Sequence, residues 1–332
     1  MEILNVIFEK AKLNKQKVAF PEATEEKILL TARECKDKGI CEPYLVGNIE
    51  EIKNASIKYC VSIDDLFLID AYDEAYLSNL ITRYALTNTM FSEKSLKRKS
   101  KDPLYTTLMM QALGDVDVTF AGLTHSTGEV ILAGQSIVGL QEGVTTVSSV
   151  GIFNIPNYNG SEGCLLGFGD SAVCTDPDSE ELASIAISAC DTIKSLLGWE
   201  PRCAMLSYST CGSGSSILVE KVVDAVKIAN EKRPDLLIDG EFQLDTAINP
   251  KIAAKKVNRE SKVAGKANII IWPDINVGNI GVKLVQQFAH ADAYGPMLQG
   301  FAKIVCDCSR GAPVSEMVGN VAMSCVRAQG AK

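Results

Sequence analysis

Lys17-Val18-Ala19-Phe20-Pro21-Glu22 is a short apolar run that ends at a proline, as a buried strand does. Pro43-Tyr44-Leu45-Val46-Gly47 has the same character. Between these runs, residues 25–38 carry apolar side chains at helical spacing, and Gly39 follows as a C-terminal cap. A strand, a helix and a second strand in this order predict a parallel sheet with helices on both faces. We therefore expect an α/β protein.

The same alternation continues along the rest of the chain. Further strands are predicted at residues 64–70, 116–121, 144–156, 202–208, 236–238 and 267–272. Helices are predicted within residues 73–101, after residues 122–129, and at residues 180–197, 217–230, 281–289 and 314–328. A chain of 332 residues is long for one core, and its composition changes near Gly143, after which the residues are β-branched and apolar. We expect one domain from residues 1–143 with 300–332, and a second from residues 144–299.

Composition and charge argue against several classes of protein. Lys and Arg number 33 against 41 Asp and Glu, and the net charge of −8 does not favour a nucleic-acid binder. No apolar run reaches the roughly 18 residues that a membrane span needs. Met1-Glu2-Ile3-Leu4-Asn5 begins an acidic amphipathic segment and not a secretory signal. We therefore expect a cytoplasmic protein that binds neither nucleic acid nor membrane.

The cysteines and histidines show no spacing typical of a metal site. Cys306-Asp307-Cys308 has no second pair near it, and His125 and His290 are the only histidines. No metal is predicted. The cysteines of a cytoplasmic protein are expected to be reduced, buried and structural. That expectation, core or near-site packing, covers Cys164, Cys174, Cys203 and Cys211.

Ser309-Arg310-Gly311 is a polar loop just ahead of a predicted helix, with Pro313 in the first turn, where proline is tolerated. Helix N-termini bind anions through free backbone N–H groups, and a guanidinium adds a planar fork of donors for phosphate oxygens. Glu316 lies seven residues after Ser309, so the first turn can direct it toward the loop. On these residues alone, an anion site and a capped helix with a surface arginine both remain open.

A second loop rich in hydroxyls and glycine lies between a predicted strand and helix. It contains Ser207, Ser209, Thr210, Gly212 and Ser213. Its backbone can cradle a phosphate, although an ordinary serine-rich turn has the same composition. It is neither a P-loop, because no Gly-Lys-Ser/Thr follows, nor a nucleophile elbow. Ser126 and Thr127 in the same way either line a site or cap a helix, and His125 is expected to be a hydrogen-bonded structural histidine.

Eight segments in the same order match one family of proteins. They are AGxxHSTGE (121–129), FGDSAV (168–173), MLSYSTxGS (205–213), DGEFQLD (239–245), AGKAN (264–268), PDINxGNIGxKLVQ (273–286), GPMLQG (295–300) and SRG (309–311). Together they cover nearly the whole chain, and they resemble the phosphotransacetylases, acyltransferases of the phosphate acetyl/butaryl type.

The resemblance implies a two-domain fold like that of the isocitrate and isopropylmalate dehydrogenases, with parallel-rich sheets flanked by helices and a cleft between the domains. It implies that the first domain takes back the C-terminal helix and that the protein is a homodimer. The implied reaction is acetyl-CoA plus phosphate to acetyl phosphate plus CoA. Coenzyme A is a substrate, and no metal or organic cofactor is implied.

The resemblance also implies roles for individual residues. Ser309 and Glu316 handle the proton of the CoA thiol, and Arg310 binds the phosphoryl group. The implied substrate-binding residues are Ser126, Thr127, Ser207, Ser209, Thr210, Gly212, Ser213, Asn279 and Arg83. A thiol pKa near 8.5 and a glutamate pKa near 4.3 differ by about 4 units, so direct proton transfer costs roughly 5–6 kcal/mol. Glu316 can act as a base only if Arg310, the Ser309 hydroxyl and the helix end stabilise the thiolate.

The sequence departs from the family at four places. Leu132-Ala133 stands where the family has Arg-Pro, and only Arg83 remains of a basic run. Cys174-Thr175-Asp176-Pro177 replaces Asn-Pro-Asn-Pro, and Glu316 replaces aspartate. The site is therefore either re-tuned, for example for propionyl or butyryl groups, or that of a non-catalytic paralogue that binds acyl-CoA. The basic run at residues 97–101 either replaces the lost charge or is a solvated loop.

A metal- and NAD-dependent decarboxylating dehydrogenase is a further alternative because of the shared fold. It is disfavoured because no Gly-x-Gly-x-x-Gly fingerprint opens a helix and no aspartate trio has metal-site spacing.

Overall fold

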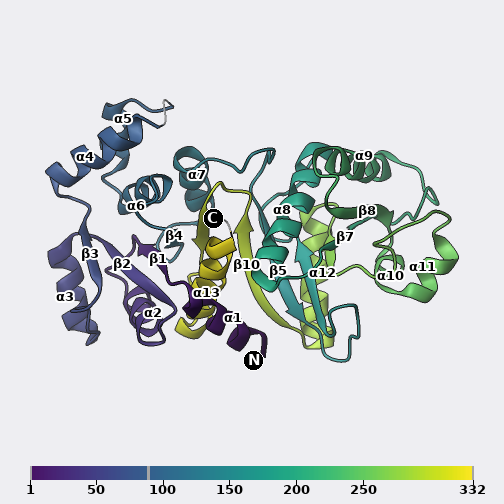
Figure 1. Cartoon of the computed structure of the whole chain (residues 1–332), viewed down its shortest axis with the longest axis horizontal. Helices are drawn as coiled ribbons and strands as arrows, with labels where there is room; N and C mark the ends of the chain where they lie inside the picture. The colour runs from purple at the N-terminus through teal and green to yellow at the C-terminus, as the bar shows by residue number, and fades with distance from the viewer. Residues whose placement is uncertain (1, 88–89, 331–332) are drawn as a thin grey trace. The chain divides into compact units, whose positions relative to one another are not determined.

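The computed structural model describes residues 2–87 and 90–330, in which helices and strands alternate along most of the chain (Figure 1). The chain folds into two compact units. The first consists of Met1–Gly139 and Phe301–Lys332, and the second is Leu140–Gly300. Each unit is built on its own largely parallel sheet flanked by helices, so the prediction of an α/β protein is confirmed.

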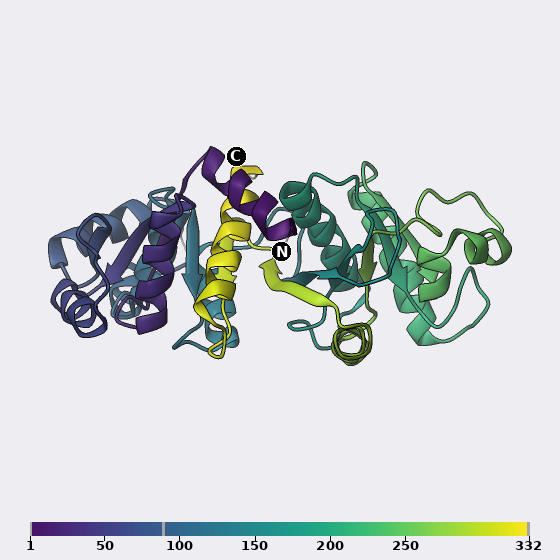
Figure 2. The ribbon, with the colours of Figure 1, turned by 90° about the horizontal axis from the view of Figure 1, so that it is seen from below.

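The first unit contains a five-stranded parallel sheet with the strand order β11-β4-β1-β2-β3. Its strands are β1 (Gln16–Phe20), β2 (Cys41–Gly47), β3 (Phe67–Asp70), β4 (Val118–Ala121) and β11 (Ile304–Asp307). Its helices are α1 (Glu2–Leu13), α2 (Glu26–Asp37), α3 (Ile49–Tyr59), α4 (Glu74–Ala85), α5 (Glu93–Lys99), α6 (Pro103–Ala112), α7 (Thr127–Ile137) and α13 (Val314–Gly330). Helix α13 packs against α1 and α2, although α1 and α13 are far apart in the sequence (Figure 2).

The apolar character of these elements explains their places. Phe20 and Phe120 are fully buried at the ends of the neighbouring strands β1 and β4, with ring centroids 5.5 Å apart. Helix α13 is buried from Met317 to Ala328, so it behaves as a core helix. Helix α2 ends where expected, because Gly39 adopts a φ of +70°, a conformation that favours glycine.

The connections that leave β1 and β4 run in opposite directions. Strand β1 leads through α2 to β2 on one side, and β4 leads into α7 on the other. Helices α2 and α13 contact each other, and α6 and α7 contact each other. Parallel sheets bind ligands beyond the carboxyl ends of their strands at such a reversal of strand order. A ligand is therefore expected at the loops after β1, β4 and β11.

The second unit contains a six-stranded sheet with the order β10-β5-β6-β9-β7-β8. Its strands are β5 (Ser148–Asn154), β6 (Leu165–Gly169), β7 (Arg202–Leu206), β8 (Leu237–Phe242), β9 (Ile269–Ile271) and β10 (Asp292–Gln299). Its helices are α8 (Ser179–Leu197), α9 (Ile217–Lys232), α10 (Leu244–Ile248), α11 (Pro250–Lys256) and α12 (Ile275–Ala289). Strands β10 and β5, and β5 and β6, pair antiparallel, and the other pairs are parallel. In the core of this unit, Phe153 on β5 packs edge-on against Phe168 on β6, and Phe168 stacks on Trp272 at the end of β9.

Several elements differ from the predictions. Helix α12 begins at Ile275, six residues before the predicted start. Strands β6, β10 and β11 were not predicted, and two of them, β6 and β10, contain glycine or proline. All eleven cysteines are free, but Cys60 and Cys164 are exposed, which contradicts the expectation that they are buried. None of the helices in the described ranges combines the length and the apolar character that crossing a lipid bilayer requires.

Candidate functional site

Three loops of the first unit meet beyond the carboxyl ends of β1, β4 and β11. Glu22 follows β1, residues 122–126 follow β4, and residues 308–313 follow β11. Strand β4 lies between the other two in the sheet, so the three loops are neighbours. Ser309, Arg310, Glu316, Ser126 and Thr127, named from the sequence, all belong to this region or to the helices that leave it.

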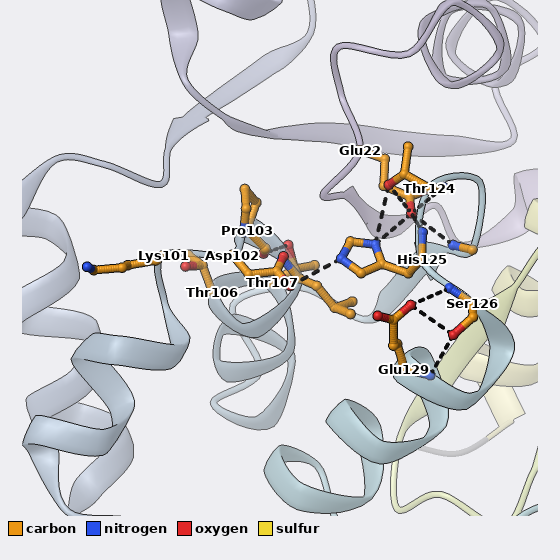
Figure 3. Close-up of polar contacts among 12 residues, drawn as sticks. Glu22, Lys101, Asp102, Pro103, Thr106, Thr107, Thr124, His125, Ser126 and Glu129 are labelled. Atoms are coloured by element: carbon orange, nitrogen blue, oxygen red, sulfur yellow. Dashed lines mark hydrogen bonds and ion pairs between the residues drawn. The ribbon is translucent and has the colours of Figure 1, made fainter.

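The carboxylate of Glu22 fills the backbone nest formed by the loop after β4. It accepts hydrogen bonds from the backbone N–H groups of Gly122 (3.3 Å), Leu123 (2.8 Å), Thr124 (2.9 Å) and His125 (3.0 Å) (Figure 3). The Thr124 hydroxyl donates a further bond of 2.9 Å. Burial raises the pKa of Glu22, but the bonds from His125, Thr124 and Leu123 outweigh it and lower the pKa to about 2. The anion that occupies this nest is therefore the Glu22 carboxylate, a side chain of the protein itself.

The His125 imidazole lies between two carboxylates, Glu22 and Asp102 (Figure 3). Nδ1 is 2.7 Å from Glu22 Oε1, and Nε2 is 3.1 Å from Asp102 Oδ2. The hydrogen bond to Asp102 and then that to Glu22 raise the pKa of His125 to about 10, so the ring is an imidazolium at neutral pH. The other oxygen of Asp102 accepts from Leu104 N and caps α6. The expectation of a hydrogen-bonded histidine is confirmed.

Helix α7 begins at the loop that Glu22 and His125 hold. The Ser126 hydroxyl accepts from Glu129 N, and the Glu129 carboxylate accepts from the Ser126 backbone and hydroxyl, which is a capping box (Figure 3). Within residues 2–87 and 90–330, no acceptor is bonded to the backbone N–H groups of Thr127 or Gly128. These two donors and the exposed Thr127 hydroxyl stand at the positive end of the helix dipole, where anions are stabilised.

In the loop after β11, the Arg310 side chain is exposed to solvent, and the backbone of the loop is hydrogen-bonded to a lysine on α2. The Lys27 ammonium on α2 donates to the carbonyl oxygens of Arg310 (3.2 Å) and Ala312 (3.0 Å). Gly311 N donates to the Ser309 hydroxyl at 3.3 Å, which closes the turn. In the part of the chain that the structure describes, neither the Arg310 guanidinium nor the Glu316 carboxylate makes a hydrogen bond or ion pair. Both side chains are exposed and so accessible to a ligand.

Asp307, the last residue of β11, links this loop to α7. Its Oδ2 accepts a 2.6 Å hydrogen bond from the Thr127 hydroxyl. Its Oδ1 is buried and has no hydrogen-bond partner among the described residues. Gly122, with a φ of +110°, packs against it, and a Cβ there would collide with Asp307 and the Cys308 backbone. Burial raises the pKa of Asp307 to about 6.

The second cluster named from the sequence lies in the second unit, between β7 and α9. The backbone N–H groups of residues 209–214 all donate within the protein. Their acceptors are the Ser207 hydroxyl, the Ser213 hydroxyl, the Glu241 carbonyl, the Glu241 carboxylate, the Thr210 carbonyl and the Ser209 hydroxyl, in that order. The Ser209 hydroxyl also donates to Glu241 at 2.7 Å. A ligand at this loop therefore meets the hydroxyls of Ser207 and Ser213, and not free backbone donors. The hydroxyls of Ser209 and Thr210 are buried and bonded within the protein, so the expectation that they face a ligand does not fit this structure.

Two further residues from the sequence lie apart from these loops. Asn279 is on α12 and donates to the Ser171 carbonyl at 3.2 Å, within the second unit. Arg83 is in the last turn of α4 and forms a two-pronged ion pair with Asp115 at 2.7 and 3.0 Å. Among the described residues, no hydrogen bond or ion pair joins Arg83 to the loop around Arg310.

Sequence reasoning did not single out Glu22, Asp102, Lys27 or Asp307. Glu22 and Asp307 stand at the carboxyl ends of predicted or short strands, and that position is the signal that could have found them. Their partners lie 100 residues or more away along the chain, for example 103 residues from Glu22 to His125 and 180 from Thr127 to Asp307. Within the described ranges, no three His, Cys, Asp or Glu side chains are grouped as metal ligands.

Comparison with known proteins agrees with the resemblance seen in the sequence. The family model for phosphate acetyl/butaryl transferases matches residues 2–325. The phosphate acetyltransferase of Clostridium acetobutylicum is 40% identical over 335 residues, which cover 99% of each protein. The crystal structure of a phosphotransacetylase from Streptococcus pyogenes matches with a TM-score of 0.90 at 32% identity, over 99% of this chain and 98% of that one.

A putative 4-hydroxythreonine-4-phosphate dehydrogenase from Salmonella typhimurium matches with a TM-score of 0.53 at 12% identity, over 94% of this chain and 99% of that one. This likeness concerns the fold alone, and it agrees with the predicted dehydrogenase-like architecture. The family match and the close relatives confirm the resemblance that the ordered motifs indicated. The chain belongs to the phosphate acetyl/butaryl transferase family.

Proposed function

We propose that this protein is a phosphate acetyltransferase, which exchanges an acetyl group between coenzyme A and inorganic phosphate. The observation that carries the proposal is the Arg310 guanidinium in the loop after β11, which has no hydrogen-bond or ion-pair partner in the part of the chain that the structure describes. Strand β11 lies next to β4, the strand that leads into α7. Two N–H groups at the start of α7, which have no acceptor among the described residues, add donors in the same region, and the Thr127 hydroxyl beside them donates to Asp307. Guanidinium, helix end and hydroxyl are the groups that bind a phosphate oxygen.

The mechanism is written for acetyl phosphate and CoA as substrates. Arg310 and the start of α7 bind the phosphoryl group, and Glu316 accepts the proton of the CoA thiol. The Ser309 hydroxyl and the charge of Arg310 stabilise the thiolate, which lowers the cost of that proton transfer. The thiolate attacks the acetyl carbonyl carbon, and Arg310 neutralises the phosphate that leaves. Holding both substrates in line supplies much of the rate, and no covalent enzyme intermediate is needed.

The remaining substrate contacts are proposals of the same kind. Ser126 contributes through the first turn of α7, while Ser207, Ser209, Thr210, Gly212 and Ser213 contribute from the loop after β7. Because the N–H groups of that loop are already bonded and Ser209 and Thr210 are buried, the hydroxyls of Ser207 and Ser213 are the groups available to substrate. Asn279 and Arg83 complete the proposed set, and Arg83 must exchange Asp115 for a substrate anion.

The direct test is thiol consumption by purified protein with CoA and acetyl, propionyl or butyryl phosphate, without added metal or nucleotide. We expect turnover that is fastest with acetyl phosphate and is lost in Arg310→Ala. Faster turnover with butyryl phosphate would reassign the acyl group but keep the reaction. Binding of CoA without turnover of any of the three would support the non-catalytic paralogue instead.

We propose that the protein is cytoplasmic and forms a homodimer through α12. Ile280, Leu284 and Phe288 recur every fourth residue on this helix and are 59%, 50% and 81% exposed. Only Gly278 and Val282 of the helix are buried, and α12 is seen end-on at the lower border of its unit in Figure 2. An apolar stripe of this length is self-complementary about a two-fold axis. Light scattering of Leu284→Glu should give a monomer, whereas Val223→Glu on α9, also exposed, should stay dimeric. A monomeric native protein would refute the proposal.

A further inference from the structure

Asp307 carries one buried carboxylate oxygen, Oδ1, and its other oxygen is hydrogen-bonded to the hydroxyl of an exposed residue. The Thr127 hydroxyl, 2.6 Å from Oδ2, stands at the N-terminus of α7, where the proposed phosphoryl group binds. Thr127 is exposed, so its oxygen can contact a ligand on one side and Asp307 on the other. A proton can therefore pass between Asp307 and a bound phosphate through one hydroxyl.

The environment of Asp307 favours its protonated form. Oδ1 is buried against Gly122 with no hydrogen-bond partner in residues 2–87 and 90–330. A carboxylate oxygen without a donor or water is costly to bury, whereas a protonated carboxyl group carries no net charge and is less costly. When Asp307 is protonated, its O–H can donate to Thr127 Oγ1, and the Thr127 hydroxyl is then free to donate outward.

The charges around Asp307 act in opposite directions. Glu22, in the loop after β1, raises its pKa, and Arg310, in its own loop, lowers it. The other titratable groups on the packed elements include the Cys306 and Cys308 thiols, His125 bonded to Glu22, and Glu129 on α7. Helix α13, which packs against β11, adds Glu316, Cys325 and Arg327. Burial is the largest influence, and it raises the pKa of Asp307 to about 6. The group therefore exchanges a proton in the range where enzymes work.

The proposed reaction needs a proton at this place. When thiolate attacks acetyl phosphate, the phosphate that leaves carries three negative charges unless it takes up a proton. Arg310 compensates part of this charge, but a guanidinium in a protein does not give up a proton. Glu316 has the opposite task, since it removes the thiol proton. A second acidic group, protonated before the reaction, can supply this proton while the thiol proton stays on Glu316.

We propose that Asp307 supplies, through the Thr127 hydroxyl, the proton that the leaving phosphate takes up. The inference rests on the proposed function and adds a donor to it. The C–O bond of acetyl phosphate breaks as the C–S bond forms, and the thiol proton stays on Glu316. The Asp307 proton moves to Thr127 Oγ1 while the Thr127 proton moves to the leaving oxygen, which gives hydrogen phosphate. Water then takes the proton of Glu316 and returns one to Asp307. In the reverse direction Asp307 accepts the proton of hydrogen phosphate.

The test is the pH dependence of kcat/KM for acetyl phosphate between pH 5 and pH 9, in the full-length protein. An acid and a base acting together give a bell-shaped profile, in which the fall on the alkaline side reports the acid. We expect the native profile to fall above a pKa of about 6. Asp307→Asn and Thr127→Val should lose about 10²–10⁴-fold in rate and lack the alkaline fall, whereas Thr127→Ser should keep both. Asp65→Asn, the same change at an exposed aspartate, should behave as the native protein.

The outcomes separate this inference from the proposed function. No turnover by the native protein, or turnover unchanged in Arg310→Ala, overturns both. Turnover that depends on Arg310, with Asp307→Asn within threefold of native and retaining the alkaline fall, overturns the proton donor alone. If Asp307→Asn does not fold, as judged by its melting curve, Thr127→Val decides, because that side chain is exposed. A Thr127→Val rate and profile like the native ones then overturn the inference.

Discussion

The replacement Glu22→Gln tests how the site is held together. It keeps the shape of the side chain but removes the charge that four backbone N–H groups, Thr124 and His125 surround. The pKa of Glu22 falls from 4.5 to about 2 on folding, and each unit is worth about 1.4 kcal/mol, so the charge contributes about 3 kcal/mol. Because the folded-state pKa is lowered, this stability is fully present above pH 4.5 and is lost as the pH falls toward 2.

Urea unfolding of the native and Glu22→Gln proteins should therefore differ by about 3 kcal/mol at pH 7 and by roughly half of that at pH 3. Far-UV circular dichroism is the suitable signal, because Trp199 and Trp272 both lie in the second unit. Hydrogen exchange of residues 118–130 gives a local measure, and protection there should fall. Glu129→Gln is the matched control at an exposed glutamate and should have a much smaller effect. A loss below about 1 kcal/mol at pH 7, or one that does not depend on pH, would refute the reasoning.

Three further predictions concern single side chains of the first unit. Arg310→Ala should lower kcat by about 10²–10³-fold, whereas Arg83→Ala should mainly raise the KM for CoA and change the melting temperature little. Steady-state kinetics that show equal, small effects of the two changes would place the site elsewhere. Leu132 is 65% exposed, so Leu132→Arg should keep the melting temperature of the native protein. The added charge should tighten CoA binding, and this effect should be smaller at high salt. Calorimetry that shows an unchanged affinity would mean that CoA is held by another route. His125→Gln should be less stable than the native protein below pH 6.5, and the difference should disappear as the pH rises through about 10; a urea series with a constant difference would contradict the imidazolium.

The regular elements could be predicted because their signals are local. Strand β1 and helix α2 follow from an apolar run, helical spacing and Gly39, all within 25 residues. Strand β10 was not predicted because Gly295 and Pro296 interrupt its apolar pattern. These residues are tolerated because β10 lies at the edge of the sheet.

The site could be predicted only in part, because its contacts depend on which strands become neighbours. The exposed loop at Ser309 and Arg310 was expected ahead of a helix, and the structure has it there. The contact between Thr127 and Asp307 needs β11 beside β4, and nothing local in either segment specifies that order. The serine-rich loop at residues 207–213 illustrates the other difficulty. Composition reveals that a turn has many donors, but not that Glu241, a distant residue, occupies several of them. Its role, like that of Arg310, stays a prediction.

The first unit is discontinuous in the sequence, and this affects how the chain folds during synthesis. Residues 140–300 form a complete unit, so they can fold on the ribosome while β4 still lacks its neighbour β11. Residues 301–330 add β11, the Arg310 loop and α13 afterwards, which at 5–20 residues per second takes about 2–6 seconds. During that interval the edge of β4 is unpaired and can pair with another chain. We therefore expect nascent chains that stop near residue 300 to be inactive and prone to aggregate, even though the unit of residues 140–300, about half of the chain, is complete.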